Sequence, residues 1–556
     1  MIRWAFYLIT VLSITNYGCG KGGGSSPPPP PTPTSFSFNS LKVNGQFSGF
    51  TYYNINRTPV FKLSFSAALN RTSVAGSVTF RDKSGASIGY NTSYENGDST
   101  VVIQPVSPLS YITKFTLSIA TTLKSTSGGS LLSGVDVNFT TQIDSSRKFP
   151  LITDNELLDK VQEQTFKYFW DFGHPVSGLA RERNTSGETV TSGGSGFGIM
   201  AIPVAINRGF ITRAQGLARM QQIVNFLKNN AVKVKGAFSH WLNGTTGAII
   251  PFSANDNGAD LVETSYLMMG LLTARQYFNG VDAAETNLRN DITTLYNNVE
   301  WDWFRQGSQN ILYWHYSPDK GWIMNFPIKG WNECLITYVL AASSPTHSVP
   351  AVVYISGWKS GNNFLNGNTY YGYQLPLGPN LGGPLFFEQY SFLGINPNGL
   401  SDPSANYLTQ AKNHSLINYN YCKINPQQYF GYSDSIWGLT ASDIEGGYTA
   451  SSPTNDRSFI APTAALSSMP FTPNESMAAL KFFYYVLGDK IWKQYGFVDA
   501  FSLHNTWFAD SFLAIDQGPI IGMIENYRTG LLWNLFTSCP EVKAGMLALG
   551  FTAPYL

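Results

Sequence analysis

Carboxylates grouped at predicted helix starts are the residues in this sequence best suited to chemistry. Asp256, Asp260 and Glu263 stand at spacings of four and three residues and lead into the apolar run Leu267-Met-Met-Gly-Leu-Leu272. Residues three or four apart share one face of a helix, so these acids are predicted to lie together. One acid at a helix N-terminus is explained by the helix dipole, but three converging acids exceed what capping requires.

Glu333 and Asp516 each stand near the start of another predicted helix, where an acid can also serve only as a cap. The stretch before Glu333 is rich in aromatic residues, including Trp322, Trp331 and the run Tyr313-Trp-His-Tyr316. Apolar sugar faces stack on large flat rings of this kind. We therefore interpret Glu333 as an acid beside a sugar-binding wall, and Asp516 as a further candidate.

Cleavage of a glycosidic bond requires two carboxyls, one protonated to donate a proton and one ionised to activate water or to attack. Acids from several helix starts that converge at one end of a helical barrel would meet this requirement. The sequence contains no G-x-S-x-G elbow, P-loop or dinucleotide fingerprint. Its four cysteines and six histidines are scattered without metal-type pairs, so we expect neither a catalytic metal nor a cofactor.

The five acids can be given different roles. We predict that Glu333 is the general acid, because partial burial between two Trp residues raises the pKa of a carboxyl. Asp260 is the first choice for the general base and Asp516 the second. Asp256 and Glu263 would then position the substrate or tune the charge.

Helical periodicity begins near residue 150 and continues to the end of the chain. Thr212 and Gln215 are typical of a capping box, and the segments beginning at Thr472 and Ser538 repeat this start signal, with Pro at or near the first helical position. Long loops rich in Gly, Pro and aromatics separate the helices, which favours an all-α (α/α)6 toroid over 150–556. Further helices are predicted near 260–278, 284–299, 333–343, 404–413 and 520–537.

In the segment 35–145 the apolar residues recur with a period of two rather than with the helical period. Apolar and polar residues alternate in short runs such as Phe61-Lys-Leu-Ser-Phe65 and Val135-Asp-Val-Asn-Phe139, with turn-rich stretches between them. Short strands at this spacing predict a small all-β immunoglobulin-like sandwich. Because it has no clustered carboxylates, we interpret it as a spacer or a weak binding module.

The N-terminus has the features of an export signal. Arg3 precedes an apolar run that is too short to span a membrane, and small residues lead to Gly18-Cys19. A signal peptide over 1–18, lipidation of Cys19 and a Gly/Pro-rich tether over 19–34 would give an exported lipoprotein, periplasmic or anchored at the outer-membrane surface. Plain secretion remains the alternative, because Asn16 and Tyr17 fit a lipobox poorly.

Composition narrows the possible partners. The chain has 556 residues, of which 43% are hydrophobic and 13% charged, with a formal net charge of +1. These values exclude a disordered chain, and the absence of a Lys/Arg block argues against nucleic acid as a partner. We expect a monomer whose contact with a membrane is made by the lipid anchor alone.

Several long motifs in 150–556 resemble the bacterial glucoamylase-like family, and within it glycoside hydrolase family 144. They are His174-Pro-Val-Ser-Gly-Leu-Ala-Arg181-Glu-Arg183, Ser239-His240-Trp241-Leu-Asn-Gly244, the segment from Asp256 to Glu263, the segment from Asn332 to His347, Trp437-Gly-Leu-Thr-Ala-Ser-Asp443, the segment from Ile460 to Pro473, and the segment from Asp516 to Gly530. Residues 1–145 lie outside the resemblance.

The resemblance implies an (α/α)6 barrel that cleaves β-1,2-glucan to sophorose or short sophorooligosaccharides with inversion. It places Asp256, Asp260, Glu263, Glu333 and Asp516 among the family's essential acids. Candidate substrate contacts are Arg181, Arg183, His240, Trp241, Trp322, Trp331, Glu388, Tyr390 and Trp507.

One position departs from the expected pattern. Glu388, in Pro384-Leu-Phe-Phe-Glu388-Gln-Tyr390, stands where we expect a non-acidic residue. An extra carboxylate beside the subsites would change chain-end preference, which leaves endo and exo action open. A glucanase of another linkage (β-1,3 or an α-glucan) and a non-catalytic glycan-binding surface lipoprotein are the alternative functions.

Overall fold

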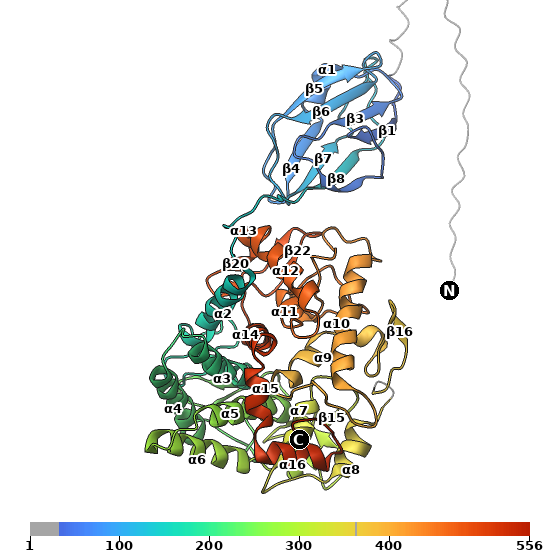
Figure 1. Cartoon of the computed structure of the whole chain (residues 1–556). Coiled ribbons are helices and arrows are strands. Elements are labelled where there is room, and N and C mark those ends of the chain that lie inside the picture. The colour runs from blue at the N-terminus through green and yellow to red at the C-terminus, as the bar shows by residue number, and fades with distance from the viewer. Residues whose placement is uncertain (1–32, 362–363) are drawn as a thin grey trace, which may run out of the picture. The chain divides into compact units, whose positions relative to one another are not determined.

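The structure, a computed structural model, describes residues 33–361 and 364–556 (Figure 1). It divides the chain into two compact units, an N-terminal β unit and a helical unit. The predicted signal peptide, Cys19 and the tether up to residue 32 lie outside the described residues. No helix in the described part of the chain is long and apolar enough to cross a membrane.

Two four-stranded sheets form the β unit, with the strand orders β1-β3-β6-β5 and β2-β8-β7-β4. The alternating apolar residues predicted from the sequence, among them Phe61, Leu63 and Val137, are fully buried. The predicted immunoglobulin-like sandwich is therefore confirmed. Its strands are β1 (Phe38–Val43), β2 (Thr51–Ile55), β3 (Phe61–Phe65), β4 (Val78–Asp82), β5 (Tyr90–Glu95), β6 (Thr100–Pro105), β7 (Lys114–Ile119) and β8 (Val135–Thr141).

Three strands escaped prediction, and all three lie at sheet edges. β1, β2 and β5 each have a neighbouring strand on one side only. β5 has the sequence Tyr-Asn-Thr-Ser-Tyr-Glu and is largely exposed. An edge strand needs little apolar alternation, so the pattern that revealed the inner strands is weak there.

The helical unit has the predicted all-α architecture, with short strands of two to four residues in its loops. Its longer helices are α2 (Asp154–Trp170), α3 (Ser192–Asn207), α4 (Arg213–Asn229), α5 (Leu261–Tyr277), α6 (Ala283–Asn297), α7 (Leu335–Ser343), α10 (Tyr407–Ile424), α12 (Pro473–Tyr485), α14 (Ala514–Arg528), α15 (Leu531–Thr537) and α16 (Pro540–Ala548). The shorter α8 (Ala351–Val353), α9 (Phe386–Gln389), α11 (Pro462–Leu466) and α13 (Gly488–Ile491) lie between them.

Helices α3, α5 and α14 form the centre of this unit. Nearly every residue of α3 is buried, and α5 is buried from Leu261 to Arg275. A helix that is enclosed on all sides has no polar stripe, which explains the weak helical periodicity of these segments. α14 packs against both α2 and α3, so the last part of the chain returns to the first helices of the unit.

Glycines allow α3 and α5 to pack backbone against backbone. A Cβ atom at Gly196 would lie 2.1 Å from the carbonyl oxygen of Tyr266, and one at Gly270 would lie 2.2 Å from the carbonyl oxygen of Gly196. No side chain fits at either position without separating the helices. This close approach sets the relative positions of the N-terminal turns of α3 and α5.

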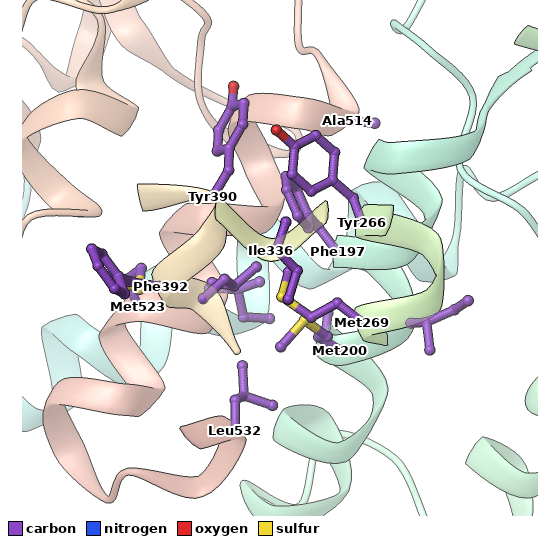
Figure 2. Packing of buried hydrophobic residues seen from close by; sticks show 14 of the residues in the cluster. Phe197, Met200, Tyr266, Met269, Ile336, Tyr390, Phe392, Ala514, Met523 and Leu532 are labelled. Carbon is purple, nitrogen blue, oxygen red and sulfur yellow. The ribbon is translucent and has the colours of Figure 1, made fainter. Parts of the chain in front are cut away.

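Apolar side chains from several helices fill the space around this contact (Figure 2). Phe197 and Met200 of α3 and Tyr266 and Met269 of α5 are almost completely buried. The cluster drawn in Figure 2 also includes Ile336, Tyr390, Phe392, Ala514, Met523 and Leu532.

Two of the predicted caps are wrong. Thr212 and Gln215 form the predicted capping box at the start of α4. Thr472, before α12, makes no side-chain cap hydrogen bond, and the residue that precedes α16 is Cys539 rather than Ser538. In both cases Pro at the first helical position removes one of the free N–H groups that a cap would otherwise satisfy.

Two helix boundaries also differ from prediction. α7 begins at Leu335, so Glu333 lies in the turn before the helix rather than at its first position. The stretch predicted near 520–537 is two helices, α14 and α15, separated by Gly530 in the left-handed conformation. Because α14 begins at Ala514, Asp516 belongs to its first turn.

We expect Gly196→Ala to destabilise the helical unit strongly. The added methyl group would overlap the backbone of α5, and overpacking of this kind lowers the free energy of unfolding by about 1–3 kcal/mol. Gly447→Ala is the matched control, because the nearest atom to its Cβ would be 4.0 Å away. Thermal unfolding of both variants measures the difference; equal midpoints would contradict the role given to this contact.

Candidate active site

A pocket of about 510 Å³ opens beside the N-terminal ends of α3 and α5. Its wall combines acids, bases and aromatic rings, as a site for a polar ligand with apolar faces requires. The lining residues include Glu182, Arg183, Thr191, His240, Trp241, Phe252, Glu263, Trp314, Glu333, Phe386, Tyr390, Tyr448, Leu513 and Ile515.

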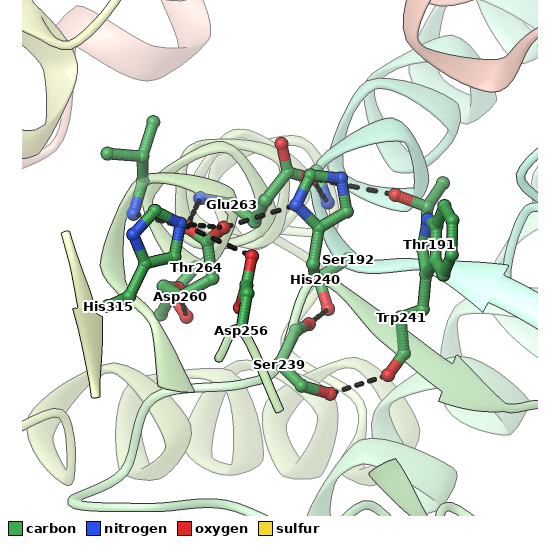
Figure 3. A network of polar contacts seen from close by, with 12 residues as sticks. Thr191, Ser192, Ser239, His240, Trp241, Asp256, Asp260, Glu263, Thr264 and His315 are labelled. Carbon is green, nitrogen blue, oxygen red and sulfur yellow. Dashed lines mark hydrogen bonds and ion pairs between the residues drawn. The ribbon is translucent and has the colours of Figure 1, made fainter. Parts of the chain in front are cut away.

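Asp260 is the N-cap of α5 and the centre of a polar network (Figure 3). Its Oδ1 accepts hydrogen bonds from the backbone N–H groups of Val262 and Glu263 at 3.0 and 2.9 Å. Its Oδ2 lies 3.2 Å from Nδ1 of His240 and 3.6 Å from Nε2 of His315. Each oxygen of Asp260 therefore has partners: Oδ1 caps α5, and Oδ2 contacts the two histidines. Asp260 is both a helix cap and a member of the acidic cluster.

The two histidines and the acids around them stabilise one another's charges. Burial by itself lowers the pKa of His240, but Glu263, Asp260 and Asp256 raise it to about 9. Burial by itself raises the pKa of Asp260, yet the hydrogen bonds from His240 and His315 bring it below its ordinary value. Asp260 is consequently an ionised carboxylate beside a protonated His240, and the hydrogen bond and charge of Asp260 also raise the pKa of His315 against the effect of burial.

Asp256 lies in the loop before α5 and completes this cluster. Its Oδ2 is 3.3 Å from Nε2 of His315. Burial, together with the charge of Asp260, raises the pKa of Asp256 to about 6. The three acids predicted from their spacing therefore do lie together, although Asp256 is not itself on the helix.

Glu263 projects from the first turn of α5 toward the start of α3. Its Oε2 accepts a hydrogen bond from the backbone N–H of Gly193 at 2.8 Å. A Cβ at Gly193 would lie 2.4 Å from this oxygen, so glycine is needed for the approach. Burial raises the pKa of Glu263, and the charge of Asp260 adds to the effect.

Glu333 lies in the wall of the pocket, in the turn before α7. Its carbonyl oxygen accepts a hydrogen bond from Oγ of Ser391 at 2.6 Å, which fixes this turn. Burial, with the negative charges of Glu263 and Asp260, raises the pKa of the Glu333 carboxyl to about 7. A carboxyl of this kind retains a proton in neutral solution and can donate it.

Asp516 lies in the first turn of α14, next in the chain to the pocket-lining residue Ile515, and is not itself a lining residue. It is 1% exposed, and neither of its carboxyl oxygens receives a hydrogen bond from a described N–H or O–H group. Its side chain contacts the carboxyl of Asp499 instead. Burial and this neighbour raise the pKa of Asp516 well above the ordinary value.

Arg183 connects this region to the pocket. Its Nη1 lies 3.1 Å from Oδ2 of Asp443, and its Nε lies 2.9 Å from Oε2 of Glu182. Arg181, by contrast, stacks over the ring of Phe172 at 4.6 Å and is not among the pocket-lining residues. Of the two predicted arginines, the structure brings only Arg183 to the pocket.

The structure brings His240, Trp241 and Tyr390 to the pocket as predicted. Trp322 lies elsewhere, with its ring centroid 4.8 Å from that of Trp303. Trp507 packs against Phe459 at 5.3 Å. These two aromatic residues therefore do not form part of the pocket wall.

Glu388 is fully buried and does not face the pocket. Its Oε1 accepts hydrogen bonds from Nε1 of Trp331 at 2.8 Å and from Nε2 of Gln410 at 2.7 Å, and it lies 3.0 Å from Nδ1 of His414. The extra carboxylate thus links three buried side chains by hydrogen bonds, and Trp331 is one of them. Neither residue has the position expected of a substrate contact.

No sequence pattern marks Asp499 or Tyr448 as a site residue. Glu182, His315 and Asp443 stand out only as members of longer motifs. Asp499 follows the two-residue strand β21 (Gly496–Phe497) and starts no helix. No pattern in its neighbourhood distinguishes it from an ordinary loop acid.

A metal ion is compatible with one group of described residues. Single ligand atoms of His240, Asp256 and Asp260 all lie within 4.8 Å of one another. With a pKa of about 9, however, His240 carries a proton that a metal would have to displace. The hydrogen bonds account for this cluster without an ion, and independence from metal stays a prediction.

Both parts of the chain are similar to known protein families. The Glycoamylase family model, which describes glucoamylase-like proteins, matches residues 325–540, and the bacterial Ig-like domain model matches residues 50–141. An exo β-1,2-glucooligosaccharide sophorohydrolase of Parabacteroides distasonis is 46% identical over 425 residues. The match covers 72% of this chain and 58% of the length of that relative.

Two solved structures are similar along most of their length. The endo-β-1,2-glucanase of Chitinophaga pinensis, in complex with sophorotriose and glucose, is 50% identical; the match covers 73% of this chain and 100% of that one, with a TM-score of 0.71. A β-1,2-glucanase of Parabacteroides distasonis is 36% identical and covers 93% of this chain and 73% of its own, also with a TM-score of 0.71. The chain therefore belongs to the bacterial glucoamylase-like family, within glycoside hydrolase family 144, and carries an N-terminal bacterial Ig-like domain.

Proposed function

We propose that this chain hydrolyses β-1,2-glucan to sophorose or short sophorooligosaccharides by an inverting mechanism, with Glu333 as the general acid. The observation that carries the proposal is a carboxyl in the pocket wall whose pKa is raised to about 7. The linkage is supported by the relatives, whose names identify them as acting on β-1,2-linked glucans.

The surroundings of Asp260 argue against its role as the base. Both of its oxygens are engaged, by two backbone N–H groups and by His240 and His315. A carboxylate whose pKa is held below the ordinary value has little affinity for the proton of water. Asp260 instead keeps His240 charged at the pocket wall.

Asp516, the second choice from the sequence, is the better candidate for the base. Its two oxygens receive no hydrogen bond from a described N–H or O–H group, so no donor lowers its affinity for a proton. Two residues shortly before it in the chain, Leu513 and Ile515, line the pocket. Its raised pKa increases its affinity for a proton.

The proposed reaction balances with these two groups. Glu333 donates its proton to the glycosidic oxygen as the bond from that oxygen to the anomeric carbon breaks. Asp516 removes a proton from water, whose oxygen attacks the anomeric carbon from the opposite face. Water between base and sugar requires the two carboxyls to lie roughly 6.5–9.5 Å apart, and the configuration is inverted.

Glu333→Gln keeps the shape of the side chain but has no proton to donate. We expect kcat to fall by at least about 10²-fold with little change in KM. In the unmodified chain kcat/KM should decrease as pH rises through about 7, since the protonated form of Glu333 is the active one. Glu300→Gln, at a surface ion pair with Lys235, is the matched control. Near-normal kcat in Glu333→Gln would remove Glu333 from this role.

Substrate class and stereochemistry are tested together. β-1,2-glucan should yield sophorose-type products, with no comparable action on β-1,3-glucan, cellulose or starch. NMR of the first-formed product should show the α-anomer, because inversion at a β-linkage produces it. Equal turnover of another glucan would favour the alternative linkage. Binding without any release of reducing ends would favour a non-catalytic glycan-binding protein.

We also propose that the chain is exported and anchored through a lipidated Cys19. The apolar N-terminal run and the Gly/Pro-rich tether after Cys19 support this. Cys19→Ser should move the protein from the membrane fraction to the soluble fraction, since stable anchoring needs acyl chains on that residue. Identical fractionation of both forms would contradict lipid anchoring and favour plain secretion.

A further inference from the structure

A second group of carboxyls, formed by Asp443, Asp499 and Asp516, adjoins the pocket-lining residue Arg183. Asp499 and Asp516 are 2% and 1% exposed. Asp443 is the third residue of β18 (Ala441–Ile444), which pairs with β19 (Gly447–Ala450) as a hairpin. Because Asp516 is the proposed general base, the role of this group rests on the proposed function.

Asp499 is held in place by the backbone on two sides. Its Oδ2 accepts a hydrogen bond from the backbone N–H of Asp443 at 2.6 Å, and its own N–H donates to the carbonyl oxygen of Ser511 at 2.9 Å. Oγ of Ser511 in turn donates to Oδ2 of Asp443 at 2.5 Å. Asp499 is thereby fixed between the β18–β19 hairpin and the segment that leads into α14.

The positive charge of Arg183 does not neutralise Asp499 and Asp516 if both are ionised. Arg183 pairs with Asp443 and with Glu182. Among the described residues, Oδ1 of Asp499 and both oxygens of Asp516 lack a hydrogen-bond donor. Two buried carboxylates in contact repel one another strongly, and one proton between them turns the repulsion into a hydrogen bond. Burial and the charge of Asp443 raise the pKa of Asp499 to about 7, although the hydrogen bond from Asp516 lowers it.

We propose that Asp499 is a positioning residue that shares one proton with Asp516 and holds this carboxyl in place to accept a proton from the attacking water. The pair then carries one negative charge before the reaction. When water attacks the anomeric carbon, its proton passes to the pair, which becomes neutral. Release of one proton to solvent restores the starting state, while Glu333 regains from solvent the proton that it gave to the leaving oxygen.

Other titratable groups face the pair and contribute to its behaviour. Asp443 and Tyr448 come from the β18–β19 hairpin, Tyr390 follows α9, and Arg183 comes from the loop before α3. The negative charge of Asp443 disfavours ionisation of Asp516, and the positive charge of Arg183 favours it. A test must therefore change Asp499 while leaving these four groups intact.

Asp499→Asn makes this change with the smallest alteration of shape. The amide oxygen still accepts the hydrogen bond from the Asp443 N–H, and the amide N–H donates to Asp516, which is then stabilised as a carboxylate. We expect the acidic limb of the kcat/KM profile to move to lower pH by at least about one unit, since an N–H donor favours the ionised acceptor. We expect kcat to fall about tenfold, because a less basic Asp516 is a weaker proton acceptor.

Asp510→Asn is the matched control, because that side chain is 93% exposed and pairs with Lys493 at the surface. Its pH profile should match that of the unmodified chain. Asp516→Asn should lose at least about 10²-fold in kcat at every pH. If Asp499→Asn lowers activity equally at all pH values, or leaves the profile unchanged, the positioning role is overturned.

A measurement without substrate separates this proposal from the proposed function. Potentiometric titration of the folded chain from pH 5 to 9 should release about one proton more than titration of Asp499→Asn or of Asp516→Asn. Having two variants keeps the test decisive if one of them does not fold. Equal proton release would overturn the shared proton even in an active enzyme. A one-proton difference in a chain that cleaves no glucan would uphold the pair and remove the proposed function.

Discussion

The backbone contact between α3 and α5 is the constraint on which the rest of the site depends. Gly196 and Gly270 let the two helices approach until no side chain fits between them. Their N-terminal turns then lie side by side, and the N–H of Gly193 reaches the carboxylate of Glu263 at 2.8 Å. The glycine-rich start of α3 is thus as much a part of the site as the acids that it positions, because a wider spacing would leave Glu263 buried without a donor.

The buried carboxyls of the site are stabilised in two different ways, by hydrogen-bond donors or by a shared proton. Asp260 remains ionised because α5 and two histidines supply donors to both of its oxygens. Oδ1 of Asp499 and both oxygens of Asp516 have no such donors among the described residues. A shared proton therefore has a lower free energy in the low-dielectric interior than two ionised carboxylates. The donors around Asp260 lower its proton affinity, whereas the lack of donors raises the proton affinity of Asp516. Aspartates of one site therefore differ in their chemistry.

The inner parts of the fold were predictable because their patterns are local. Apolar and polar residues alternate in the buried strands, and Asp256, Asp260 and Glu263 follow helical spacing.

Positions decided by long-range packing were not predictable. Glu388 points into the interior because Trp331, Gln410 and His414 surround it. Asp499 is brought to Asp516 by the fold, from a loop that carries no motif. Prolines replaced side-chain caps at α12 and α16, which local sequence rules do not distinguish from true capping boxes.

Inverting hydrolysis requires a protonated acid and an ionised base at the same pH, which two identical buried carboxyls cannot provide. Glu333, with its pKa raised to about 7, keeps its proton up to neutral pH. A lone Asp516 in the same interior would also be protonated there and could not act as a base. The pair that Asp516 forms with Asp499 ionises near pH 7, because the pKa of Asp499 is raised only to about 7, so an acceptor oxygen exists around neutral pH, where Glu333 is still partly protonated. The second aspartate is therefore what makes the two requirements compatible in one buried site.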